Sequence, residues 1–158
     1  MKRIIIFLAI IAFIWSCGGG DSTAGDESRT PPKSMIPDAV EDDGKGLGEI
    51  KEVKLNNPLS AAMVERGKGI YEMKCAACHK LSTQRVVGPG WEGLTSIRKP
   101  EWIMNMITNV EMMLAEDPTA QALLEECLIR MPNQNLSIGD SRDVLEFMYS
   151  IDGVPVGE

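Results

Sequence analysis

Two cysteines and a histidine at residues 75–79 have the spacing of a haem attachment site. They are Cys75, Cys78 and His79, in the pentapeptide Cys-Ala-Ala-Cys-His. In such a site both thiols add to the vinyl groups of the porphyrin, and the adjacent imidazole binds the iron. His79 is the only histidine in the sequence. We therefore expect one covalent haem c, attached through Cys75 and Cys78, with His79 as the proximal iron ligand.

Two other kinds of site use a similar set of residues. A zinc site needs four ligands, and Cys75, Cys78, His79 and Cys127 would complete that number. A thioredoxin-like redox dithiol requires a preceding strand in a βαβ context, whereas this motif follows a helical pattern. Haem c is therefore the favoured reading. We interpret Cys127 as a small apolar core residue.

The second axial position of the iron needs a ligand other than histidine, so methionine, lysine, water or an open site remain. The sequence contains ten methionines. Met131 is followed by Pro132, which ends the preceding helix and leaves a loop that can carry the thioether inward. We expect Met131 to be the sixth ligand. Three other methionines lie on apolar helical stripes, where a core-filling role is favoured; these are Met106, Met113 and Met148.

The N-terminal residues are typical of an export signal. Lys2 and Arg3 precede an apolar run at residues 4–14 that is too short to span a bilayer, which takes about 20 residues. The end of this run, Ile-Trp-Ser-Cys at residues 14–17, resembles the lipobox of bacterial lipoproteins, in which Cys17 would be lipidated. An uncleaved signal anchor and cleavage further on are the alternatives. We expect the protein to be exported and lipid-anchored through Cys17 to a bacterial membrane, facing the periplasm or the cell exterior.

The composition divides the chain into three parts. Residues 1–16 are the predicted lipoprotein signal peptide. Residues 17–45 are rich in Gly, Ser, Thr, Pro, Asp and Glu, so they cannot bury a core and are predicted to form a disordered membrane tether. Residues 46–158 are the predicted haem domain, and residues 46–56 have enough apolar side chains to lie on it as an extended arm.

The charge of the chain bears on its partners. The formal net charge is −7, and it becomes −9 when residues 1–16 with Lys2 and Arg3 are removed. Such a surface disfavours nucleic acid and favours transient docking to redox proteins with a basic surface.

The folded part is predicted to be all-α. Four helices are expected to begin at Asn57–Pro58, Lys99–Pro100, Asp117–Pro118 and Ser137, where capping residues and prolines precede apolar stripes. The first helix would run into the haem motif, and the last would stop near Gly153. Residues 87–91 break regular structure. No segment shows sustained period-two alternation, so a sheet is not expected.

In the order of its motifs, the chain resembles the class I mono-haem cytochromes c over residues 58–150. The matching pieces are a helix with Gly67 and Tyr71 before the attachment motif, then Gly88–Pro89, Met131–Pro132, and a final helix with Tyr149. The resemblance implies a small helical domain wrapped around one haem. It also implies that the carbonyl of Pro89 orients His79, that Met131 is the axial methionine, and that the first and last helices cross where Gly67 and Tyr71 meet Tyr149.

Residues 100–107, at the start of a helical insert that spans residues 100–130, together with residues 131–136 resemble lipoprotein cytochromes associated with bacterial nitrous oxide reduction. The expected function is therefore that of a membrane-anchored electron carrier, not an enzyme, which passes single electrons between respiratory components, with a periplasmic terminal reductase or oxidase as a candidate acceptor. An open-site haem protein, peroxidase-like or gas-binding, is the alternative.

Overall fold

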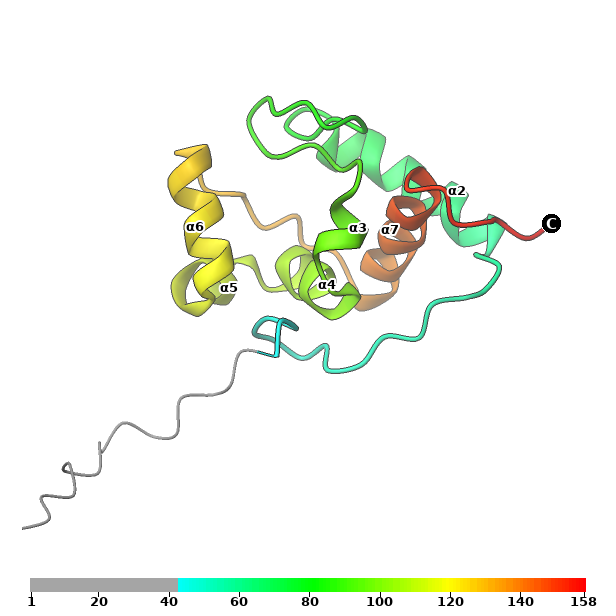
Figure 1. The fold of residues 1–158 in the computed structure, drawn as a ribbon, viewed down its shortest axis with the longest axis horizontal. Helices are drawn as coiled ribbons and strands as arrows, with labels where there is room; N and C mark the ends of the chain where they lie inside the picture. The colour runs from blue at the N-terminus through cyan, green and yellow to red at the C-terminus, as the bar shows by residue number, and fades with distance from the viewer. Residues whose placement is uncertain (1–42) are drawn as a thin grey trace, which may run out of the picture. The chain divides into compact units, whose positions relative to one another are not determined.

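The structure, a computed structural model, describes residues 43–158 (Figure 1). Cys17, the predicted signal peptide and most of the predicted tether lie outside the described residues. Within residues 43–158 the chain is helical and shows only isolated β-bridges, which confirms the predicted fold class. No helix of this range is long and apolar enough to cross a membrane. The elements are α2 (Ala61–Ile70), η2 (Tyr71–Cys75), α3 (Leu94–Ile97), α4 (Pro100–Thr108), α5 (Val110–Glu116), α6 (Pro118–Cys127) and α7 (Ile138–Ile151).

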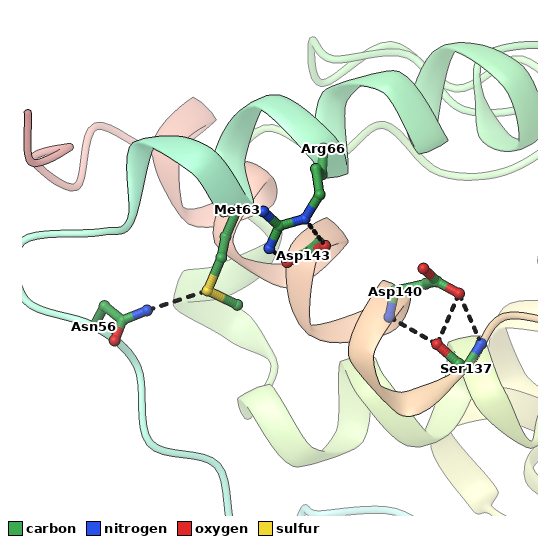
Figure 2. A network of polar contacts seen from close by, with 6 residues as sticks. All are labelled: Asn56, Met63, Arg66, Ser137, Asp140 and Asp143. Atoms are coloured by element: carbon green, nitrogen blue, oxygen red, sulfur yellow. Dashed lines mark hydrogen bonds and ion pairs between the residues drawn. The ribbon is translucent and has the colours of Figure 1, made fainter.

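The first and last helices, α2 and α7, pack directly against each other (Figure 1). Gly67 is buried at their contact, where a Cβ atom would collide with the backbone carbonyl of Asp143. Arg66, one residue earlier, forms an ion pair with the Asp143 carboxylate at 2.6 Å (Figure 2). The absence of a side chain at Gly67 therefore lets the two helices approach closely, as the sequence predicted.

The aromatic partner at this crossing differs from the prediction. The ring of Tyr71 packs against Phe147, with 5.7 Å between ring centroids, and not against Tyr149. Phe147 lies one helical turn after Asp143, so it shares the face of α7 that meets α2. Tyr149 lies two residues further on, about 200° around the helix.

The start of α2 also differs from the prediction. The helix begins at Ala61 with Ser60 as its N-cap, not at Asn57–Pro58. The reason is tertiary, because Leu59 is buried in a β-bridge with Val156 and its N–H donates to the carbonyl of Pro155. The C-terminal tail thus holds Leu59 in a β-bridge, and residues 57–59 stay outside the helix.

The stripe that was expected to form one helix from Pro100 forms two. Asn109, with φ −138° and ψ 46°, leaves the helical region between α4 and α5. An asparagine side chain can hydrogen-bond to nearby backbone groups in place of the helical hydrogen bonds, which favours a break at this residue. The short helix α3 was not expected, whereas α6 and α7 begin at the predicted capping residues Asp117 and Ser137.

Residues 46–56 lie on the domain as an extended arm whose backbone is satisfied by buried side chains. Asn105, fully buried on α4, accepts a hydrogen bond from the N–H of Ile50 at 3.1 Å and donates to its carbonyl at 2.9 Å. Glu101, one turn earlier, accepts from the N–H of Val53 at 3.1 Å. These contacts take the place of the backbone hydrogen bonds that a neighbouring β-strand would supply.

A second buried carboxylate joins the arm to both terminal helices. Glu146 of α7 is fully buried and accepts from the N–H and the side-chain amide of Asn56 at 3.2 and 3.0 Å. It also accepts from the N–H of Ser60 and pairs with Arg142 at 2.6 Å. One side chain therefore fixes the end of the arm, the start of α2 and the middle of α7.

Candidate haem site

The attachment motif begins inside a π-helical turn at the end of α2. In η2 the N–H of Ala76 donates to the carbonyl of Tyr71 at 2.9 Å, a five-residue step. Such turns are often found at functional sites, where the extra residue changes the direction of the side chains that follow. The N–H groups of Cys78 and His79 both donate to the carbonyl of Cys75, which closes the motif into a compact loop.

His79 is held by a carbonyl, an aromatic ring and a glycine. Its Nδ1 lies 2.8 Å from the carbonyl oxygen of Pro89, and its ring centroid lies 5.8 Å from that of Trp91. A Cβ atom on Gly88 would collide with the imidazole, so this loop can cover the ring only with glycine there. Because Nδ1 is engaged with a carbonyl, Nε2 carries the lone pair that a metal needs.

The charge state of His79 suits a ligating role. Burial lowers the pKa of the imidazole, while the hydrogen bond with the Pro89 carbonyl acts in the opposite direction. Since burial is the larger effect, the ring is neutral at pH 7. The hydroxyl of Tyr71 donates to the carbonyl of His79 at 2.8 Å, which fixes the backbone of the residue as well.

One apolar cavity brings the predicted site residues together. It encloses about 1210 Å³ of space between atoms, part of it open to solvent. Cys75, Cys78, His79, Pro89 and Met131 all line it. The remaining walls are mostly apolar and come from α4, α6 and α7, including Ile103, Ile107, Leu123, Leu124, Val144 and Met148.

The three methionines predicted to fill the core all lie in it or against it. Met113 and Met148 are buried, with 0% and 1% of their surfaces exposed. Met106 is only half-buried, and it lines the cavity together with Met131 because its face of α4 is turned toward that space. Met106 nevertheless packs against the core, as expected, and both it and Met148 also form part of the cavity wall.

The zinc and dithiol alternatives are not supported by this geometry. Cys127 is half-buried and lines the same cavity as Cys75, Cys78 and His79, so it is not the enclosed core residue that was expected. Even so, no three His, Cys, Asp or Glu side chains within residues 43–158 are grouped as metal ligands. Burial raises the pKa of the Cys75 thiol to about 11; among the smaller effects, Lys74 lowers this pKa and Cys78 raises it. An attacking cysteine of a redox dithiol has a lowered pKa instead.

Two features of the site were not assigned from the sequence. Trp91 was interpreted only as part of a structure-breaking segment, but its ring is buried between His79 and Tyr71, with 4.8 Å between the Trp91 and Tyr71 centroids. Trp102 was not singled out either, although it lines the cavity and donates from its indole nitrogen to Asp117 at 3.2 Å. The only available signal for both was an aromatic residue near a Gly-Pro pair or a helix start.

The apolar cavity is lined by two cysteines and by an oriented imidazole. This arrangement fits a porphyrin covalently attached through Cys75 and Cys78. These features define a c-type haem protein with an all-α fold. The family model described as Cytochrome c matches residues 64–152, and the chain belongs to the cytochrome c family. The cofactor is accordingly one covalent c-type haem.

Solved structures support the same conclusion. The structure is similar to the cytochrome c from Rhodothermus marinus, with 29% sequence identity and a TM-score of 0.66, over 69% of this chain and 93% of that one. An engineered variant of the Rhodothermus marinus protein, bound to a carbene intermediate, matches with 28% identity and a TM-score of 0.62 over 69% and 94% of the two chains. No curated protein gave a significant match.

Proposed function

We propose that the protein is a lipid-anchored, exported electron carrier of a bacterial respiratory chain whose haem iron is held by His79 and Met131. The observation that carries this proposal is the shared cavity, because His79 and Met131 lie in its walls together with both attachment cysteines. A bound haem c with two axial ligands supplies a one-electron Fe(III)/Fe(II) couple that needs little rearrangement. The residues of the chain hold the ligands and exclude water.

The composition of the cavity wall favours a carrier over an open-site haem protein. Apart from His79, the charged or titratable residues among the described residues that line the cavity are Lys74, Arg130 and cysteines. A peroxidase-like site needs a positioned acid or base near the open face of the iron. The described residues that line the cavity therefore include no carboxylate and no second imidazole, and they supply apolar packing around the haem.

The test is an optical spectrum of the purified holoprotein, oxidised and reduced, with carbon monoxide added to the reduced form. A closed His/Met site should show the weak near-infrared sulfur-to-iron band and should bind carbon monoxide slowly. A wild-type protein that lacks this band and binds carbon monoxide at once would support the open-site alternative.

The membrane location and partners form the second part of the proposal. The lipobox-like residues 14–17 support an anchor at Cys17, and the net charge of −9 without residues 1–16 supports redox partners with a basic surface. We propose a periplasmic terminal reductase or oxidase as the acceptor. The similarity of residues 100–107 and 131–136 to cytochromes of nitrous oxide reduction favours a reductase.

The anchor is tested by Cys17→Ser in the full chain. This change should release the haem protein from the membrane fraction or block its processing, whereas Ser16→Ala should leave both unchanged. Identical fractionation and mature mass for Cys17→Ser and the wild type would show that residues 1–16 act in another way.

A further inference from the structure

The segment that carries Met131 has few connections to the rest of the domain. It follows α6 through Leu128, whose φ of 61° ends the helix, and it continues to the start of α7. Within the described chain, residues 129–136 form no backbone-to-backbone hydrogen bond with another element. Helix α6 itself packs mainly against α5, on the side of the domain away from the α2–α7 pair (Figure 1). The position of Met131 therefore depends on side-chain contacts.

Arg85 lies in the loop that follows the attachment motif and leads to Gly88. Its backbone forms an antiparallel β-bridge with His79. The same loop is closed by the N–H of Gly88, which donates to the carbonyl of Cys78 at 3.0 Å. The backbone of Arg85 is thus fixed to the attachment motif.

The side chain of Arg85 reaches across to the last turn of α6. One guanidinium nitrogen pairs with the Glu126 carboxylate at 2.6 Å, and the other donates to the sulfur of Cys127 at 3.3 Å. Cys127 lines the cavity, and Met131 follows it by four residues. Arg85 consequently connects the wall that holds His79 to the helix end from which the Met131 segment begins.

Two weaker contacts also reach the segment. Lys74 donates to the carbonyl of Gln134 at 3.2 Å, and Arg130 pairs with Glu111 at 3.0 Å. Arg130 and Glu111 both belong to the α5–α6 side, so their pair cannot fix the distance between the two walls. Lys74 makes a single hydrogen bond to an uncharged carbonyl, whereas the guanidinium of Arg85 makes an ion pair and a second contact.

We propose that Arg85 is a positioning residue for the axial methionine: through Glu126 and Cys127 it holds the Met131 segment at a fixed distance from His79 and so keeps the sulfur on the iron. This inference rests on the proposed role of Met131 as the sixth ligand. Both partners of the ion pair are partly exposed, with 39% and 59% of their side-chain surfaces accessible. The effect should therefore be modest and should weaken with ionic strength.

The test uses the haem-loaded protein and compares Arg85→Gln, Glu126→Gln and the charge-reversed pair Arg85→Glu with Glu126→Arg. At low ionic strength, each single variant should increase the rate of carbon monoxide binding to the reduced protein by a factor of about 2 to 5, the range that one exposed ion pair allows. Each should also weaken the near-infrared sulfur-to-iron band on warming. High salt should remove the difference from wild type, and the reversed pair should restore the wild-type rate.

Arg66→Gln is the matched control, because Arg66 also makes an ion pair at 2.6 Å, with Asp143, but joins α2 to α7 (Figure 2). It should lower the melting temperature and leave the carbon monoxide rate unchanged. Equal rates for Arg85→Gln and wild type, or an equal increase in Arg66→Gln, would overturn the positioning role. A wild-type protein that lacks the band would overturn the proposed function as well, so the two failures are distinguishable.

Discussion

At the scale of single residues, the proposed role of Met131 as sixth ligand would close the iron site. A thioether is uncharged and soft, so it favours Fe(II) and raises the potential. Met131→Ala should lower the reduction potential, remove the near-infrared band and admit carbon monoxide. Met113→Ala is the matched control, because Met113 is completely buried and does not line the cavity. The control should cost about 2–5 kcal/mol of unfolding free energy and keep the band. The reverse pattern would reject the ligand assignment.

Glu146 is the buried residue with the largest expected effect on stability. Its carboxylate is paired with Arg142 and accepts hydrogen bonds from the arm and from the start of α2. Removing one partner of a buried ion pair typically costs about 3–5 kcal/mol, because the other charge is left without compensation. Denaturant unfolding of Glu146→Ala should show a loss in this range. The exposed Glu125→Ala on α6 should change the unfolding free energy by less than about 0.5 kcal/mol. Similar values for both variants would contradict the structural role of Glu146.

At the scale of elements, the contact between α2 and α7 depends on one glycine. Gly67→Ala would push its new methyl group into the backbone of Asp143, which cannot move without shifting α7. We expect a destabilisation of at least about 1–3 kcal/mol, the usual cost of overpacking. Gly69→Ala lies on the same helix with no atom within 4 Å of the added Cβ, so it should instead gain up to about 1 kcal/mol of helix propensity. The measurement is the melting temperature of each variant. If both variants shift the melting temperature in the same direction, the contact between α2 and α7 accepts a side chain at residue 67 more easily than the structure indicates.

At the scale of the whole molecule, the haem cavity lies in the position of a core. Helices α4, α6 and α7 all turn apolar side chains toward it. Replacing Cys75 and Cys78 together with Ala should abolish covalent haem, seen as loss of haem staining on a denaturing gel. The near-ultraviolet circular dichroism of the variant should also weaken, because tertiary packing around the cavity is lost. Haem staining equal to that of the wild type would contradict the attachment assignment.

The sequence by itself determined the features that depend on local chemistry. The attachment motif specified the cofactor, because vinyl addition requires two thiols at this spacing next to a ligating imidazole. The starts of α4, α6 and α7 were predictable, since caps and prolines act within one helical turn. Gly67 at a helix crossing and Pro89 beside His79 were implied by the resemblance to class I cytochromes c, and the structure places both accordingly.

Only the tertiary structure decided features that depend on residues far apart in the chain. Leu59 is extended because the C-terminal tail pairs with it, which no local propensity encodes. Phe147, not Tyr149, meets Tyr71 because the rotation of α7 is fixed by its packing on α2. Asn105, Glu101 and Glu146 are polar residues on helices, and a periodicity argument places such residues in solvent. They are buried because the arm brings unpaired backbone groups to them, and a buried polar group is stable only with such a partner.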